Sequence, residues 1–266
     1  MYEFHYHRPQ SLEDAAKLFD EADDPQYLAG GQTLIPVMKQ RLAMPSDLID
    51  LGCISELNGI TANKDALTIG AMTRHAEVAS SDEVRKSIPA LASLAGDIGD
   101  PAVRNLGTLG GSIANNDPAA DYPAALVGLG ASVQTTSREI AAEDFFTGMF
   151  ETALEEGEMI VNVTYPIPQG AVYEKLPNPA SRYATVGVFI ARTGEGVRVA
   201  VTGAGPCVFR AADIEAALET DFTPGALEGI SISADGLNSD LHASAEYRAH
   251  LISVLARRAA ARARAG

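Results

Sequence analysis

Residues 100–126, DPAVRNLGTLGGSIANNDPAADYPAAL, decide which kind of fold the chain can adopt. The segment places the pair Gly110-Gly111 between the hydroxyl residues Thr108 and Ser112, and its last part, from Asp121, reads as the start of a helix. A polar loop of this length usually has a functional role. Paired glycines let the backbone approach an anion closely with its N–H groups pointing at it. The segment therefore predicts a loop that holds an anionic group, with Asp121 available either as a helix N-cap or as an acceptor for ligand hydroxyls.

A second glycine pair occurs earlier in the chain. Ala29-Gly30-Gly31-Gln32-Thr33 follows a short apolar piece, and residues 34–41 read as a helix with Pro36 in its first turn, where proline is tolerated. We expect Thr33 to cap this helix, so that the positive end of the helix faces the same point as the glycine amides. Taken alone, the pair could equally be a plain turn between a strand and a helix.

The rest of the chain alternates short strands with helices. Alternating or apolar runs predict strands at residues 2–6, 48–51, 66–69, 132–136, 159–165, 171–176, 185–192 and 197–202, and helical spacing predicts helices from Ser11 and at 88–98, 210–218 and 245–264. The proline-rich stretch 166–179 marks a change of lobe.

Composition limits the class of protein. A chain of 266 residues with 46% hydrophobic and 21% charged residues should fold, most simply as two domains. Its formal net charge of −15 repels nucleic acid and anionic lipid, so neither is an expected partner. The same charge means that a bound phosphate has to be held by short-range backbone donors.

Cys53 and Cys207 are the only cysteines, and no Cys/His cluster is spaced for zinc or iron–sulfur ligation, so we expect no metal site in this chain. The N-terminal segment lacks the features of a signal peptide and no apolar run reaches spanning length, which predicts a cytoplasmic protein without a membrane span. The five histidines are scattered and none has a partner at catalytic spacing, so all are expected to be surface or structural residues.

Neither glycine pair fits the G-x-G-x-x-G pattern of Rossmann domains or the phosphate loop of nucleoside triphosphatases. The sequence therefore argues against a Rossmann domain and against a nucleoside triphosphatase. Instead, residues 29–39, AGGQTLIPVMK, and residues 108–115, TLGGSIAN, resemble the two flavin-binding motifs of the medium, FAD-binding subunit of molybdenum hydroxylases, the carbon monoxide dehydrogenase and xanthine dehydrogenase family. IGAMTRH at 69–75, VTGAGP at 201–206 and SAEYR at 244–248 resemble further elements of that family, so the likeness covers nearly the whole chain.

The resemblance implies an α+β fold: a two-lobed FAD-binding domain of the vanillyl-alcohol oxidase type with a small C-terminal α+β domain. On this chain, the FAD-binding domain would span residues 1–172, with lobes at about 1–56 and 57–172. Residues 173–266 would form a C-terminal domain of the carbon monoxide dehydrogenase flavoprotein type. The flavin would lie between them.

The resemblance also implies a set of cofactor-binding residues and no catalytic or metal-binding ones. Residues of the two glycine loops would follow the pyrophosphate and adenosine, Asp121 the ribityl chain, and Met159 and Ile160 the adenine or the ring edge. Lys175 would approach the isoalloxazine, where a cation could stabilise the charge of the reduced ring. The full set is Leu28, Ala29, Gly30, Gly31, Gln32, Thr33, Leu34, Thr108, Gly111, Ser112, Asn115, Asp121, Met159, Ile160 and Lys175.

Two positions depart from the family pattern. Ser181-Arg182-Tyr183 stands where relatives often place an acidic residue, which puts the ring-side contacts and the electron acceptor in doubt, and Arg74 replaces a more usual threonine.

By the same resemblance, the chain would be the electron-transfer subunit of an oxidoreductase. An iron–sulfur (2Fe-2S) small subunit and a molybdopterin large subunit would be its partners, assembled as a dimer of heterotrimers, and FAD would pass electrons to NAD or a quinone-type acceptor. The alternatives are a self-contained flavin-dependent oxidase or dehydrogenase of the same fold, and a flavin-free binding module in which the glycine loops are only turns.

Overall fold

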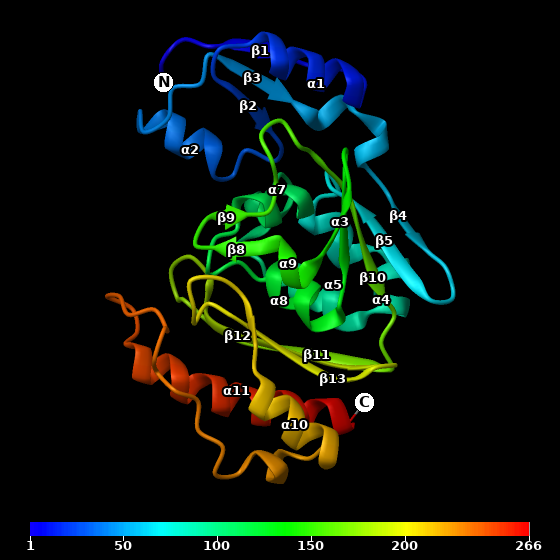
Figure 1. Cartoon of the computed structure of the whole chain (residues 1–266), viewed down its shortest axis with the longest axis vertical. Coiled ribbons are helices and arrows are strands. Elements are labelled where there is room, and N and C mark those ends of the chain that lie inside the picture. Colours follow the sequence, from blue (N-terminus) through cyan, green and yellow to red (C-terminus); the bar gives the residue numbers. More distant parts are fainter. Residues whose placement is uncertain (266) are drawn as a thin grey trace.

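The computed structural model describes residues 1–265 and arranges them as three stacked parts along the long axis, with the N-terminus at one end and the C-terminal helix at the other (Figure 1). The three parts are an N-terminal lobe, a middle lobe and a C-terminal part. No helix in residues 1–265 is both long enough and apolar enough to cross a membrane.

The N-terminal lobe is a small parallel sheet with helices beside it. Its elements are β1 (His5–His7), α1 (Leu12–Glu21), β2 (Pro25–Leu28), α2 (Leu34–Lys39) and β3 (Asp47–Asp50), with strand order β1-β3-β2. The Ser11 hydroxyl caps α1 by accepting the Asp14 N–H at 3.1 Å, as expected from the sequence. The strand predicted at residues 2–6 is wrong in its extent, because parallel pairing with β3 begins only at His5.

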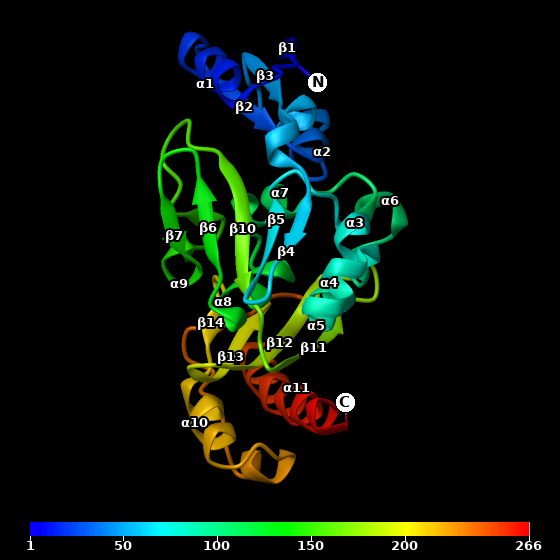
Figure 2. The same ribbon diagram turned by 90° about the vertical axis from the view of Figure 1, so that its right-hand side faces the viewer.

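The middle lobe is built on an antiparallel sheet of order β4-β5-β10-β6-β7, which Figure 2 shows beside its helices. One helix of this lobe, α8 (Tyr122–Leu129), is buried along its whole length. The other elements are η1 (Leu51–Cys53), η2 (Ser55–Leu57), β4 (Ile60–Ala62), β5 (Ala66–Gly70), α3 (His75–Ser80), α4 (Asp82–Ser87), α5 (Pro89–Gly96), α6 (Pro101–Arg104), α7 (Leu109–Asn115), β6 (Ser132–Thr135), β7 (Glu139–Ala141), α9 (Ala142–Phe145), β8 (Phe146–Gly148), β9 (Glu151–Thr152) and β10 (Ile160–Pro166).

Asn116 joins α7 to the β8–β9 hairpin. It ends α7 in the left-handed conformation, with φ 42°, and its side chain is buried. Its Nδ2 donates to the Gly148 carbonyl at 2.8 Å and to the Glu151 carbonyl at 2.7 Å. At the hairpin tip, Phe150 also has a positive φ, 58°, while its N–H donates to the Asn116 carbonyl. Asn116 therefore fixes the hairpin against the end of α7.

The C-terminal part is a four-stranded antiparallel sheet with helices on its outer face. It comprises β11 (Gly170–Pro177), β12 (Ala184–Thr193), β13 (Gly196–Thr202), β14 (Phe209–Arg210), α10 (Ala212–Thr220), η3 (Pro224–Leu227) and α11 (Ala245–Ala265). Side chains alternate along β12: Phe189 belongs to the core of the middle lobe, whereas Val188 and Ile190 belong to a second core with α10 and α11. Phe189 lies directly on α8, since a Cβ on Gly128 would sit 2.8 Å from its ring. The sheet thus separates two cores and contributes to both.

Most predicted elements are present, with shifts at their ends. The helix predicted at 34–41 ends at Lys39, because Arg41 takes a positive φ of 61°. The helix predicted at 210–218 runs from Ala212 to Thr220, because Arg210 pairs in β14 instead. The proposed domain boundary between residues 172 and 173 falls inside β11, and it stays a prediction.

Candidate cofactor site

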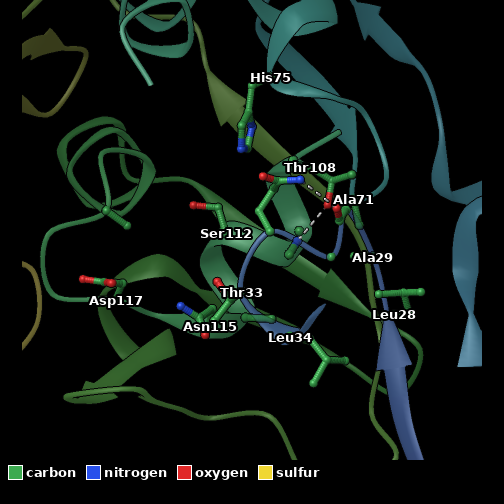
Figure 3. Close-up of a pocket in the computed structure, with 18 of the residues that line it drawn as sticks. Leu28, Ala29, Thr33, Leu34, Ala71, His75, Thr108, Ser112, Asn115 and Asp117 are labelled. Carbon is green, nitrogen blue, oxygen red and sulfur yellow. Dashed lines mark hydrogen bonds between the residues drawn. The ribbon is translucent and has the colours of Figure 1, made fainter. Parts of the chain in front are cut away.

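A cavity of about 680 Å³ lies between the N-terminal and middle lobes and extends to the turn between β11 and β12. Its walls come from the turn after β2, the first half of α2, the helix α7, the start of α8, the start of β10, and residues 181–183. Figure 3 shows Leu28, Ala29 and Thr33 of the first glycine segment together with Thr108, Ser112 and Asn115 of the second, all in the wall of this space. Segments from all three parts of the fold line this cavity.

The two glycine turns, residues 29–33 and residues 108–112, pack directly on each other. A Cβ on Gly111 would lie 3.2 Å from the Ala29 Cβ and 4.0 Å from the Gly30 nitrogen. A Cβ on Gly30 would collide with the Leu106 carbonyl oxygen. Both positions require glycine for close approach. The two turns therefore lie side by side in the wall of one cavity.

The first glycine turn presents free backbone donors. Gly31 has φ +68°, a left-handed conformation that turns the chain back on itself before α2. Within residues 1–265, the N–H groups of Gly30, Gly31, Gln32 and Thr33 have no hydrogen-bond acceptor, although this segment lines the cavity. Successive unpaired amides of this kind form an anion-binding concavity. Thr33 occupies the N-cap position, but the prediction that its side chain caps α2 is wrong, because its backbone is already helical and its hydroxyl makes no capping bond.

The second glycine turn uses its amides inside the protein, so the expectation that they also face the anion is wrong. The N–H groups of Leu109 and Gly110 donate to the carbonyls of Thr73 and Ala71, at 3.0 and 2.7 Å. The Gly111 N–H donates to Thr108 Oγ1 at 3.2 Å, which caps α7. This turn therefore brings α7 close to the first turn and presents the side chains of Ser112 and Asn115 to the cavity.

Asp121 lines the cavity and occupies the N-cap position of α8, as predicted, but its side chain makes no capping bond. Its Oδ1 accepts the Tyr173 hydroxyl at 2.6 Å and the Lys175 ammonium at 2.9 Å, both from β11. Burial raises the pKa of the Asp121 carboxyl, while the Lys175 charge and the two donors act in the opposite direction. The carboxylate is thus held in place by two donors before any ligand arrives.

All but one of the expected cofactor-binding residues line the cavity, including Met159 and Ile160 at the start of β10. The exception is Lys175, whose side chain is only 7% exposed and whose ammonium lies behind Asp121. Whether these residues contact a cofactor stays a prediction.

Sequence reasoning missed several residues of the cavity wall, and His75 is the most notable. It begins α3, lines the cavity, is only 4% exposed, and its Nδ1 has no hydrogen-bond partner in residues 1–265. Burial lowers the pKa of His75 to about 4, so the ring is neutral near pH 7. The sequence contained a signal for His75, because His75 is the last residue of the segment 69–75 that resembles the family. The other polar wall residues outside the expected set are Gln26, Tyr27, Asp117 and Glu158, together with residues 181–183, which the sequence analysis had already connected with the ring-side contacts.

These features fit FAD. A diphosphate needs hydrogen-bond donors, and the free amides of the first glycine turn can supply them. Cβ atoms added to the glycines of this turn would meet neighbouring atoms, so the turn has room only for glycine. Ribityl and ribose hydroxyls need acceptors and donors, and the cavity offers Asp121, Asp117, Ser112 and Asn115. Leu28, Leu34, Val37 and Met72 supply apolar wall. In residues 1–265, no group of three or more His, Cys, Asp or Glu side chains is arranged to hold a metal ion. The fold and the cavity define a dinucleotide-binding protein of the flavoprotein class.

Comparison with known proteins identifies the family. Residues 2–168 match the FAD binding domain in molybdopterin dehydrogenase, and residues 171–263 match the CO dehydrogenase flavoprotein C-terminal domain. The chain belongs to this family of molybdenum hydroxylase flavoproteins and is an FAD-binding oxidoreductase subunit.

The relatives are medium chains of multi-subunit enzymes. The chain is 38% identical to the nicotine 6-hydroxylase medium subunit of Paenarthrobacter nicotinovorans, covering 95% of this chain and 94% of the relative. It is 36% identical to the carbon monoxide dehydrogenase medium chain of Afipia carboxidovorans, covering 98% and 97%. A structure of carbon monoxide dehydrogenase from Hydrogenophaga pseudoflava, which lacks the Mo-pyranopterin moiety of the molybdenum cofactor, superposes with a TM-score of 0.90 at 36% identity, over 99% of this chain and 98% of that one. The predicted FAD-binding architecture with its C-terminal α+β domain is confirmed.

Proposed function

We propose that this chain is the electron-transfer subunit of a molybdenum-containing hydroxylase or dehydrogenase. In this proposal, a 2Fe-2S small subunit and a molybdopterin large subunit are its partners in a dimer of heterotrimers. Electrons pass from the iron–sulfur clusters through the FAD of this chain to NAD or a quinone-type acceptor. FAD supplies the redox chemistry when bound, and the residues of this chain bind it, orient it and shield it from water.

The observation that carries the proposal is the row of unbonded amides from Gly30 to Thr33 at one end of a cavity that reaches residues 181–183. The net charge of the chain is −15, so long-range attraction does not favour a diphosphate. Neutral amides held in place by the fold can bind it at short range without a lysine or arginine beside them. This arrangement supports binding of a resident dinucleotide, and the similarity to medium chains of other enzymes supports a place in a larger complex.

Within the cavity, we assign the pyrophosphate to the first glycine turn and neighbouring side chains to the hydroxyls. Ser112 and Asn115 face the first turn from α7 and suit the pyrophosphate and adenosine. Asp121, already oriented by Tyr173 and Lys175, suits a ribityl hydroxyl. Met159 and Ile160 are assigned to the adenine or ring edge.

Expression of the chain with the genes that neighbour it tests the proposal. We expect purified protein to show a flavin spectrum, and a complex containing iron–sulfur and molybdenum subunits to reduce its flavin when the substrate of the large subunit is added. Stopped-flow reoxidation of that reduced complex by NAD and by a quinone distinguishes the acceptors. A colourless chain that added FAD cannot colour, alone or in the complex, would overturn the proposal.

One observation favours the alternative of a self-contained flavin-dependent oxidase or dehydrogenase. Such an enzyme needs a base beside the substrate, and His75 is a neutral, buried imidazole in the cavity wall with an unbonded Nδ1. Substrate turnover by the isolated chain, abolished in His75→Gln with FAD still bound, would select this alternative.

A further inference from the structure

The loop that joins β9 to β10, residues 153–159, reaches the N-terminal lobe at one edge of the cavity. Figure 1 shows this loop extending from the middle lobe toward β2. Leu154 and Glu158 line the cavity from the loop, and Tyr27 lines it from β2. The two lobes therefore meet across this edge of the cavity.

Glu158 anchors the loop to the middle lobe. Its side chain is only 2% exposed, and its carboxylate accepts the Thr135 hydroxyl at 2.6 Å and Arg138 Nε at 3.2 Å. The same carboxylate accepts the Glu155 N–H, at 2.8 Å, from within the loop. Buried carboxylates with several donors are held in a fixed position. The loop is thus tied to the middle lobe independently of its contact with the N-terminal lobe.

Gly157, in the same loop, meets an aromatic pair of the N-terminal lobe. The rings of Phe19 and Tyr27 are stacked, with their centroids 4.7 Å apart. Gly157 has a φ of +76°, which favours glycine, and a Cβ there would lie 3.3 Å from the Phe19 ring. The Tyr27 hydroxyl donates to the Gly157 carbonyl at 3.2 Å. The loop therefore rests on the aromatic pair and is held there by one directional bond.

This bond has no equivalent elsewhere between the lobes. Across the described chain, it is the only hydrogen bond or ion pair that joins residues 1–50 to residues 54–265. The other contacts between the lobes are packing contacts: an apolar cluster that includes Ile49 and Met159, and the two glycine turns. Apolar contacts are non-directional and tolerate small displacements better than a hydrogen bond does. The Tyr27 hydroxyl therefore sets the position of the loop against the N-terminal lobe.

We propose that Phe19, Tyr27 and Gly157 form a clasp that closes this edge of the cavity, and that FAD enters and leaves when the clasp opens. The inference rests on the proposed function, because it takes FAD as the occupant of the cavity. Tyr27 is a positioning residue, since its hydroxyl acts on the loop and not on the cofactor. The clasp uses no atom of FAD, so it opposes opening equally in the empty and in the loaded chain. It slows entry and release together and leaves the affinity unchanged.

The test compares Tyr27→Phe with Tyr2→Phe in the full chain. Tyr27→Phe keeps the stacked ring and removes the donor, whereas Tyr2, in the same lobe, is 45% exposed and serves as the matched control. Stopped-flow quenching of FAD fluorescence gives the association rate constant, and recovery of that fluorescence after dilution gives the dissociation rate constant. In Tyr27→Phe we expect both to rise about fivefold, which corresponds to about 1 kcal/mol for one neutral hydrogen bond. The Kd should stay the same, and Tyr2→Phe should match the unchanged chain.

Gly157→Ala tests the other side of the clasp. The added Cβ meets the Phe19 ring and strains a backbone with positive φ, so the loop has to move away from the aromatic pair. Both FAD rate constants should rise again. Gly170→Ala, where a Cβ meets nothing within 4 Å, is the control and should change neither. Unchanged rate constants in Gly157→Ala would contradict the clasp.

Hydrogen exchange followed by mass spectrometry gives a measurement that needs no FAD. Peptides that cover residues 154–158 should exchange faster in Tyr27→Phe than in Tyr2→Phe, while peptides of the buried helix α8 report global stability and should not change. If neither protein binds FAD but the loop still exchanges faster, the proposed function fails and the clasp stands as a contact that closes the cavity.

Three results would overturn the clasp. The first is unchanged exchange of residues 154–158, or an equal acceleration in α8, because the loop is then not held by Tyr27 in particular. The second is faster exchange of the loop with both FAD rate constants unchanged, because opening of the loop then does not limit passage of FAD. The third is faster dissociation alone with a raised Kd, because Tyr27 then acts on the bound cofactor and not on the opening of the cavity.

Discussion

The Tyr173 hydroxyl lies 2.6 Å from the Asp121 carboxylate and donates to it from β11, across the junction between the middle lobe and the C-terminal sheet. Both groups are buried. Tyr173→Phe removes this donor and leaves the carboxylate with only Lys175, so we expect the free energy of unfolding to fall by about 1–3 kcal/mol. Urea unfolding measures the loss. Tyr247→Phe, at a position 47% exposed, is the matched control and should have no effect.

Gly30→Ala should abolish FAD binding. The added Cβ would collide with the Leu106 carbonyl and move the first glycine turn away from the second. Gly170→Ala is the control, because a Cβ there meets nothing within 4 Å. Titration with FAD, followed by quenching of its fluorescence, compares the two variants. Equal affinity would show that the close approach of the turns is not needed for binding.

His75 should make the protein sensitive to mild acid. Because its pKa in the folded chain is lowered from 6.5 to about 4, the unfolded chain binds the extra proton throughout that interval. Stability contributed by neutral His75 is therefore present above pH 6.5 and declines as the pH falls toward 4, by about 3 kcal/mol in all. Urea unfolding at several pH values should give a flatter profile for His75→Gln. The exposed His250→Gln should keep the original slope.

Substitutions at Asn116 separate the contribution of its side-chain hydrogen bonds to stability from that of its backbone conformation. Asn116→Gly keeps a residue suited to φ 42° but loses the bonds to Gly148 and Glu151, whereas Asn116→Ala loses the bonds and adds backbone strain. We expect the alanine variant to be less stable than the glycine variant by about 1 kcal/mol, and both to be less stable than the unchanged chain. Thermal unfolding of the three proteins provides the order. An alanine variant equal to the glycine variant would contradict the strain argument.

Sequence reasoning located both glycine turns because glycine pairs next to hydroxyl residues are a local signal, and the structure brings those turns together. It did not show which turn offers free amides. The bonds from Gly110 to Ala71 and from Leu109 to Thr73 join segments far apart in the sequence, so no local pattern reports them. The environment of Lys175 was missed for the same reason, since its three acceptors lie on three different segments.

Phe189 joins the β11–β14 sheet to the middle lobe, and this contact bears on whether the two parts can fold separately. Its ring fills space against Gly128 in the middle lobe, although the residue belongs to the C-terminal sheet. A chain truncated between the two parts would expose the space beside Gly128 to water. The separate C-terminal part would expose the Phe189 ring, and the lost burial of this one side chain would cost about 2–3 kcal/mol of stability. We therefore expect the two family regions to depend on each other for folding and to melt in a single calorimetric transition, and a recombinant exchange of one of them to require a compatible Phe189–Gly128 contact.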